Sequence, residues 1–284
     1  MCRLFGFRSD IPARVHHSLV TEKNSLRTQS REHQDGWGIA SYDKGELPEV
    51  AHGLGAAHSD REFERVSGLL SSHAVLAHVR RASVGRVHLH NAHPFLYRAW
   101  AFAHNGTISD FDQHRQALEQ EIDPAFRKLI GGETDSERCF YIFLTRLRAI
   151  ASDFAKADAA SLAAALAQTM RVVSQLTDRA DLLSSMNFIV TNGRLMAATR
   201  RQRTLFVSDR SQHRSKTAHR LANDARLNQL VIASEELTSE DHWHPVPEEG
   251  IVSIDGEMRF RSWQLSELAP SPPPRPPNAL MSSG

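Results

Sequence analysis

The chain has 284 residues, enough for one large domain or two small ones, and its 40% hydrophobic content suffices for a sizeable core. Its formal net charge of +1 gives no indication of a nucleic-acid or membrane surface, and no apolar run approaches the roughly 18 residues of a membrane span. Two cysteines exclude a disulfide framework and favour a reducing, cytoplasmic location. The N-terminus is too charged and too poor in apolar residues for a signal peptide.

The first residues place a cysteine directly after the initiator methionine. If Met1 is removed, Cys2 carries both a thiol and a free α-amine. An α-amine has a pKa of roughly 7.7–8.0 and can act as a base near neutrality, while a thiolate is a nucleophile. The apolar Leu4, Phe5 and Phe7 predict a buried strand that would hold this terminus. The alternative is a cysteine at an ordinary frayed terminus.

The next part of the chain alternates predicted helices and strands. Apolar positions within 12–30 and 60–72 predict helices, and the run over 74–79 predicts a buried strand. Between them lies His33-Gln34-Asp35-Gly36-Trp37-Gly38, which leads into a strand. Its two glycines indicate close backbone approach, either in a turn into a core strand or in the wall of a pocket.

Two adjacent arginines, Arg80 and Arg81, follow the strand over 74–79. A guanidinium is the natural bidentate clamp for a carboxylate, so one or both can bind an anionic group. The alternative is a solvated pair in a loop, and for Arg81 this alternative is preferred.

Three histidines in the following loop form an H-x-H-x-x-H array: His88, His90 and His93. Their spacing matches no standard zinc signature, and no thiolate or carboxylate lies beside them. The sequence therefore predicts neither a metal site nor a cofactor. Pro94-Phe95 is expected to fold the loop inwards instead.

A strongly apolar strand from Trp100 ends in His104-Asn105-Gly106. Asn-Gly is ordinarily the strongest short-range signal for a hairpin turn. Because the strand before it is buried, the Asn105 amide and the Gly106 N–H could instead both point at one oxygen. That is the composition of an oxyanion hole, and the local sequence leaves both interpretations open.

Two helices are predicted in the middle of the chain. An amphipathic helix follows Glu133-Thr134-Asp135, and Asp135 in its first turn suits the helix dipole, so capping is an alternative to a binding role. Cys139 lies among the apolar residues of this helix and is expected to belong to the core. The alanine-rich stretch 151–176 predicts one long helix.

The last third of the chain is predicted to be rich in strands. Asn192-Gly193 and Asp255-Gly256 each separate two apolar stretches and predict hairpins. The tail from Pro270 holds six of the twelve prolines and has little to bury. We therefore expect one domain over residues 2–265 and a disordered tail over residues 266–284.

Four separated motifs together resemble the class II glutamine amidotransferases of the N-terminal nucleophile superfamily. They are Met1-Cys2 and the stretches 78–83, 104–106 and 133–137, in the order and spacing of that family. The stretches 33–38 and 233–237 are similar to its stand-alone members. The resemblance covers about residues 2–265 and implies an α+β fold, the four-layer αββα sandwich, which suits the mixture of predicted strands and helices.

The resemblance implies a role for each catalytic residue. Cys2 would attack the side-chain amide of glutamine, with its own amine as the base, and form a thioester while ammonia leaves. The Asn105 side chain and the Gly106 N–H would bind the tetrahedral oxyanion.

The resemblance also implies the residues that bind the substrate. Arg80 would pair with the α-carboxylate of glutamine and Asp135 with its α-ammonium. Ser83 and His104 belong to the matched motifs and are expected beside the substrate.

The chain departs from the larger members of the family in two ways. They often have Trp where Arg81 stands and Thr-His where Ser83-Val84 stand, and they carry a synthase domain that receives the ammonia. A separate synthase subunit is therefore an expected partner, while nucleic acid and membranes are not.

The chain could instead be a γ-glutamyl amidohydrolase acting on a small modified substrate. It could also be a non-catalytic glutamine-binding module, which a retained Met1 would favour because the amine would then be blocked.

Overall fold

The structure is a computed structural model, and it describes residues 2–43, 47–210 and 221–268. The tail predicted to be disordered comprises residues 266–284, and residues 269–284 of it lie outside the described residues. Its first three residues belong to the folded body, because Leu265–Glu267 form a 3-10 helix and Leu268 packs against the core. No helix in the described ranges is both long and apolar enough to cross a bilayer.

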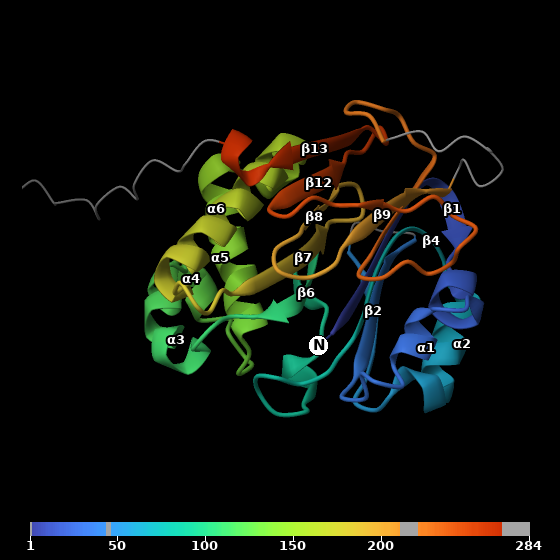
Figure 1. The fold of residues 1–284 in the computed structure, drawn as a ribbon, viewed down its shortest axis with the longest axis horizontal. Helices are drawn as coiled ribbons and strands as arrows, with labels where there is room; N and C mark the ends of the chain where they lie inside the picture. The colour runs from blue at the N-terminus through green and yellow to red at the C-terminus, as the bar shows by residue number, and fades with distance from the viewer. Residues whose placement is uncertain (1, 44–46, 211–220, 269–284) are drawn as a thin grey trace, which may run out of the picture.

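Two antiparallel sheets pack face to face at the centre of the molecule (Figure 1). Within the described residues the first sheet has seven strands in the order β11-β9-β10-β1-β4-β2-β3, and the second has six in the order β13-β12-β8-β7-β6-β5. The strands of the first sheet are β1 (Arg3–Arg14), β2 (Trp37–Tyr42), β3 (Glu49–Gly53), β4 (Ser71–Val79), β9 (Phe206–Asp209), β10 (Gln229–Ala233) and β11 (His244–Pro245). Those of the second are β5 (Phe95–Tyr97), β6 (Trp100–Thr107), β7 (Ser185–Thr191), β8 (Met196–Thr199), β12 (Gly250–Ile254) and β13 (Phe260–Gln264).

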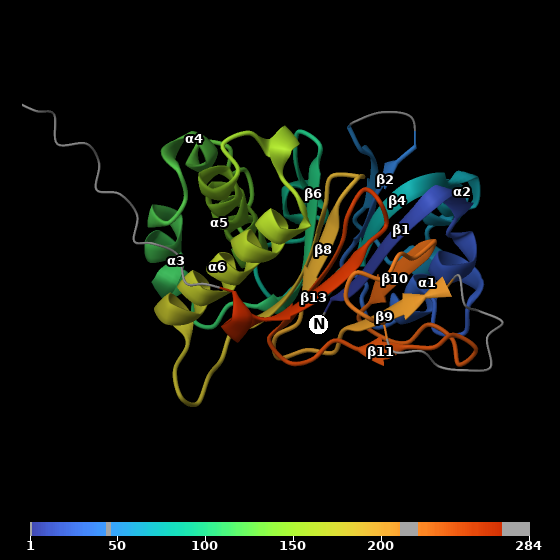
Figure 2. The same ribbon diagram turned by 90° about the horizontal axis from the view of Figure 1, so that it is seen from above.

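Helices cover the outer face of each sheet (Figures 1 and 2). The first sheet is covered by α1 (Leu26–Gln29) and α2 (Arg61–Leu69), with a short π-helix at His17–Thr21. The second is covered by α3 (Phe111–Gln120), α4 (Pro124–Arg127), α5 (Asp135–Ile150) and α6 (Ala159–Thr177). This arrangement is the four-layer αββα sandwich, so the predicted fold class is confirmed.

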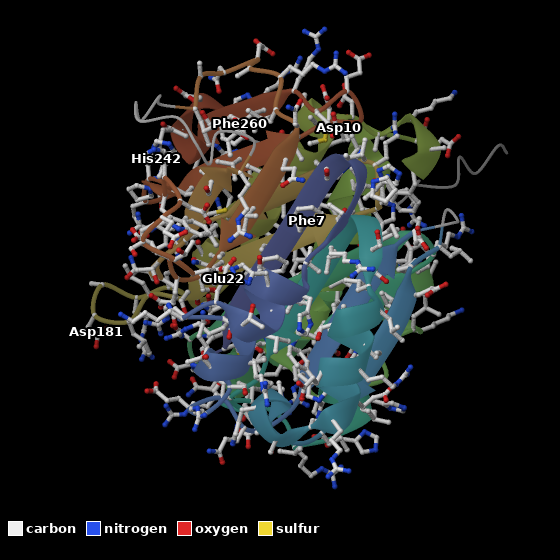
Figure 3. The ribbon with its side chains drawn as sticks, turned by 90° about the vertical axis from the view of Figure 1, so that its right-hand side faces the viewer. Phe7, Asp10, Glu22, Asp181, His242 and Phe260 are labelled. Atoms are coloured by element: carbon white, nitrogen blue, oxygen red, sulfur yellow. The ribbon has the colours of Figure 1, made fainter. Side chains whose placement is uncertain are left out.

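Strand β1 runs through the middle of the first sheet, between β10 and β4. Seen from the side of α1 and α2, it carries Phe7 near its middle and Asp10 towards its far end (Figure 3). Because side chains alternate along a strand, Leu4 faces the second sheet while Phe5 faces the helices. Both faces are therefore buried, which explains the nearly continuous apolar run at the start of the chain.

Three apolar cores fill the spaces between the four layers. One lies between the second sheet and its helices, one between the two sheets, and one between the first sheet and its helices. Cys139 belongs to the first of them and is fully buried, as the sequence predicted.

The structure decides one local alternative and corrects one local prediction. Asn105-Gly106 does not form a hairpin turn, because β6 continues to Thr107 and pairs with β7 throughout, so long-range strand pairing overrides the local turn signal. The predicted helix over 151–176 begins only at Ala159, because the side chain of Asp158 accepts a hydrogen bond from Ser161 N (2.7 Å) and caps the helix there.

Phe102 is a test of the core beneath the second sheet. Its ring is fully buried, with ring centroids 5.2 Å from Phe140 and 5.1 Å from Phe188. We expect Phe102→Ala to lower the free energy of unfolding by about 3–5 kcal/mol, because it removes buried surface and leaves a cavity. Urea denaturation measures this. Leu69→Ala is the control, since Leu69 is 73% exposed and should change stability by about 0.5 kcal/mol or less. Equal effects of the two would contradict the described core.

Candidate active site

Cys2 lies directly before β1, with its side chain on the face of the first sheet that Leu4 turns towards the second sheet. It is 9% exposed. Its Sγ lies 3.4 Å from the backbone N and 3.5 Å from the backbone O of Arg81. Burial raises the pKa of the Cys2 thiol above its ordinary value, while the contact with Arg81 and the charge of Arg80 oppose this rise. A thiol in this position needs a base to become a nucleophile.

Asp35 fixes the backbone segment that faces Cys2. Its N–H donates to Arg80 O (2.9 Å), and its Oδ2 accepts from Ala82 N (2.8 Å). Gly36 has φ of +129°, and a Cβ there would lie 2.9 Å from the carbonyl oxygen of Gly53, so the turn needs glycine. The motif at 33–38 thus both begins a core strand and supports the site wall. Asp35 was not among the predicted site residues, although it directly precedes the glycine turn that leads into β2.

Arg80 is 4% exposed and organises the loop that follows it. Its guanidinium donates to three carbonyl oxygens, those of Val84 (2.9 Å), Gly85 (3.2 Å) and Arg86 (3.1 Å). A guanidinium has five N–H donors, so at most two remain for a bound carboxylate. Burial lowers the pKa of Arg80. The negative charges of neighbouring groups, among them Cys2 and Asp135, raise it. Arg80 and Asp135 therefore lie near the same thiol, although 55 positions separate them in the sequence.

Asn105 and Gly106 lie near the end of β6. Asn105 is 2% exposed, and its Nδ2 donates to the hydroxyl of Ser234 (3.2 Å). Its Oδ1 is buried and has no hydrogen-bond partner among the described residues. A Cβ on Gly106 would lie 2.0 Å from Ser185 O and 2.3 Å from His104 Nε2, so no other residue fits there.

Asp135 is the first residue of α5, and Thr134 is the residue that caps the helix, through a hydrogen bond from Glu137 N (3.2 Å). The Asp135 carboxylate is 3% exposed. Its Oδ2 accepts from Ile108 N (2.8 Å), and its Oδ1 accepts from Ser136 N (2.8 Å). Asp135 therefore joins α5 to the segment that leaves β6, a position that capping alone does not require.

His104 lies behind the site rather than in it. It is 1% exposed and, by strand alternation, faces the helices while Asn105 faces the first sheet. Its Nε2 lies 2.9 Å from Ser185 O, and its Nδ1 lies 2.9 Å from the Ser136 hydroxyl. A carbonyl only accepts, so Nε2 carries the proton and Nδ1 accepts from Ser136. The expected contact of His104 with substrate is not part of this geometry; His104 supports the packing of α5 against β6 and β7.

Ser83 lies in the loop after Arg81, and its hydroxyl is 3.3 Å from that of Thr107. A cavity of about 600 Å³ opens beside these two residues, a size typical of small-molecule sites. Cys2 and Asn105 do not line this cavity, but the loop after Arg81 and the end of β6 contribute to its wall. Its wall consists of Ser83, Val84, Gly85, Thr107, Ile108, Asp110, Phe111, Asp112, Gln113, Arg115 and Glu133.

The histidines of the predicted array separate. His88 and His90 are exposed on a 3-10 helix, whereas His93 is 3% exposed and stacks on His78 with ring centroids 4.2 Å apart. Phe95 is also buried, so the loop folds inwards as expected. Within the described ranges no group of three or more potential ligands is placed to hold a metal ion.

A four-layer sandwich with a buried cysteine directly before its central strand β1 and an Asn-Gly pair near the end of β6 is the architecture of the N-terminal nucleophile type of amidotransferase domain. The sequence pattern described as "Glutamine amidotransferases class-II" matches residues 1–273, and the chain belongs to this family. The resemblance drawn from the motifs is thereby confirmed.

Two curated relatives show the range of the family. A probable glutamine amidotransferase of Saccharomyces cerevisiae is 28% identical over 291 residues, which cover 89% of this chain and 82% of the yeast protein. The γ-glutamyl-hercynylcysteine sulfoxide hydrolase of Mycobacterium tuberculosis is 32% identical over 118 residues, which cover 38% of this chain and 50% of that protein.

Solved structures show the same fold. The class-II domain protein from Silicibacter pomeroyi superimposes with a TM-score of 0.63 at 19% identity, over 95% of this chain and all of that one. The glutamine phosphoribosylpyrophosphate amidotransferase of Bacillus subtilis superimposes with a TM-score of 0.60 at 18% identity, over 93% of this chain and 49% of that one.

His78 predicts a pH dependence of stability. It is fully buried, and burial lowers its pKa to about 3. An unfolded histidine has a pKa of about 6.5, so below that pH the unfolded state takes up a proton that the folded state does not. Stability should therefore fall as the pH drops from about 6.5 towards 3. We expect His78→Gln to make the slope between pH 6 and 5 shallower by at most about 1.4 kcal/mol per pH unit.

Urea denaturation at pH 5, 6 and 7 measures this slope. The matched control is His88→Gln, since His88 is exposed. Equal slopes for wild type and His78→Gln would contradict a buried, neutral His78.

Proposed function

We propose that the protein is a glutamine amidotransferase in which Cys2 cleaves the side-chain amide of glutamine through a thioester. The observation that carries the proposal is that Ser234 joins Asn105 to Leu4, two residues after Cys2, so the strand that follows the cysteine and the Asn-Gly pair are held together. With Met1 removed, the α-amine of Cys2 accepts the thiol proton, and the thiolate attacks the amide carbon. The C–N bond breaks, the amine returns the proton to the leaving ammonia, and water hydrolyses the thioester to glutamate.

Asn105 and Gly106 supply the oxyanion hole in this proposal. The Asn105 amide has two N–H groups, of which Ser234 accepts one, so the second is available to the developing charge. The Gly106 N–H is the second proposed donor, and the residue must be glycine because a Cβ there would meet Ser185 O and His104 Nε2. Donors that are already held in place stabilise the transition state without reorganising during the reaction.

Arg80 and Asp135 form the substrate clamp. Free glutamine presents a carboxylate and an ammonium on one carbon, so its recognition needs a cation and an anion close together. Both residues are almost fully buried, and the charge of each acts on the Cys2 thiol. At most two guanidinium donors of Arg80, on Nε and Nη1, are not used within its loop, and these are the proposed contacts of the carboxylate.

The fate of the ammonia distinguishes transfer from simple hydrolysis. The fold covers only 49% of the Bacillus subtilis amidotransferase chain. We therefore propose a separate synthase subunit as the acceptor when transfer takes place. A reduced Cys2 thiol is required in either case, which favours the cytoplasm.

A γ-glutamyl amidohydrolase is the second candidate. The cavity of about 600 Å³ next to Ser83 and Thr107 can take a substrate larger than free glutamine, and one relative carries a hydrolase name of this type. Ammonia release from glutamine should be compared with the release of amines from γ-glutamyl amides, on protein shown by mass spectrometry to lack Met1. If the protein binds glutamine but cleaves neither substrate class, both enzymatic functions are excluded, and the protein is a non-catalytic glutamine-binding module.

Cys2 is the proposed nucleophile, and Cys139 is the matched control. Cys2→Ala should abolish amide cleavage and leave the melting temperature nearly unchanged, because the thiol makes only weak contacts with Arg81. Cys139→Ser should retain the catalytic rate in the folded fraction, since Cys139 is a fully buried core residue. Ammonia release and thermal melting measure both effects. An active Cys2→Ala protein would exclude the mechanism.

The substrate clamp makes a separate prediction. Arg80→Lys should lower kcat/KM for glutamine by at least about tenfold, because a point-charge ammonium cannot both hold the three loop carbonyls and bind a carboxylate as the planar guanidinium can. Asp135→Asn should raise KM for glutamine more than it lowers kcat. Steady-state kinetics with thermal melting tests both variants. Loss of stability with unchanged KM would make Asp135 a structural residue only.

A further inference from the structure

The stretch 233–237 at the end of β10 holds the backbone that follows the nucleophile. Ser234 is 1% exposed, and its Oγ accepts a hydrogen bond from Leu4 N (2.9 Å). Its own N–H donates to Leu4 O (3.1 Å). Both backbone polar groups of Leu4, two residues after Cys2, are therefore bound by one residue that lies 230 positions away in the sequence.

The next residue extends this contact towards the terminus. Glu235 forms an ion pair with Arg3 (3.3 Å), and the Arg3 guanidinium donates to Cys2 O (3.1 Å). Two consecutive residues after β10 thus hold the first residues of β1. The pair with Arg3 is partly exposed and contributes little stability by itself, so Ser234 is the stronger of the two contacts.

Ser234 also reaches the second sheet. Its Oγ accepts from Asn105 Nδ2 at 3.2 Å, inside the protein. One hydroxyl therefore bonds to the strand that carries the nucleophile and to the proposed oxyanion donor. Without this bond the Asn105 amide could rotate about its last torsion, since its Oδ1 has no partner among the described residues.

We infer that Ser234 is a positioning residue that holds the Asn105 amide in its catalytic orientation and at a fixed distance from the nucleophile strand. The inference rests on the proposed amide cleavage. Reacting groups must be held within about 0.5 Å of the productive geometry, and a misplacement of about 1 Å can cost about 10² in rate. Ser234 touches neither substrate nor reacting atoms in this role; it acts through Asn105.

Ser234→Ala is the first test. We expect kcat for amide cleavage to fall about 10- to 100-fold, less than the about 10²–10³ typical of losing an oxyanion donor. KM should stay within about threefold, because the charge develops only in the transition state. The matched control is Ser72→Ala: Ser72 is fully buried in the same sheet, and its Oγ accepts from Tyr42 N (3.0 Å) and donates to Tyr42 O (2.7 Å). It should lose stability but keep kcat within about twofold.

A double-mutant cycle with Asn105→Ala separates orientation from general destabilisation. In the Asn105→Ala background, Ser234→Ala should lower kcat by less than about twofold, because the group that it orients is already gone. Alkylation of Cys2 by iodoacetamide, which needs no oxyanion donor, should proceed in Ser234→Ala within about threefold of the wild-type rate. Additive losses in kcat, a loss confined to KM, or an equal loss in Ser72→Ala would each overturn the inference.

Ser234→Thr and Ser234→Val form a second pair, to be used where Ser234→Ala does not fold. The Thr and Val side chains have nearly the same shape, but only Thr has a hydroxyl. We therefore expect the kcat of Ser234→Thr to be about tenfold higher than that of Ser234→Val. Equal rates would overturn the inference. Wild-type protein that cleaves neither glutamine nor γ-glutamyl amides would instead remove the proposed function itself.

Discussion

The pairing of Leu4 with Ser234 is the interaction on which the site depends. Chain termini ordinarily fray because few contacts offset the entropy of fixing them. Here β1 pairs on both sides, with β10 and β4, and Ser234 binds both backbone polar groups of Leu4. The position of Cys2 is therefore set by the centre of a sheet rather than by its own side chain. The proposed role of Cys2, a nucleophile that carries its own base, requires this rigidity.

The charged groups around Cys2 are buried but not isolated. Arg80 donates to carbonyl oxygens of its own loop, and Asp135 accepts from two backbone N–H groups. Burying an ion without such bonds costs several kcal/mol, whereas hydrogen bonds to the backbone offset much of this penalty. The same bonds attach the loop after β4 and the start of α5 to the site. The proposed binding groups are therefore also part of the scaffold, which limits how freely these positions can vary.

Close packing between layers imposes a second constraint. A Cβ on Gly38 would lie 2.0 Å from the carbonyl oxygen of His93, and one on Gly106 equally close to that of Ser185. These glycines allow the loop after β4 and the strand β7 to approach the site strands directly. A cavity stays open beside Ser83 and Thr107. Under the proposed function, a substrate group beyond the glutamine would lie there, so packing would set the side of the site on which substrates can differ.

The sequence by itself determined the strands and most helices, because apolar periodicity reports which faces are buried, and it identified Cys2, the arginine pair and the Asn-Gly pair as chemically unusual. It did not determine that β6 continues through Asn105, since the local turn signal is overridden by pairing with β7. The start of α6 depended on the Asp158 cap within an alanine-rich stretch that looked uniformly helical. Only the tertiary structure assigned roles to Asp35 and Ser234, because their bonds reach residues 47 and 129 positions away. Local patterns carry no information about hydrogen bonds over such separations, and these bonds turn separate motifs into one site.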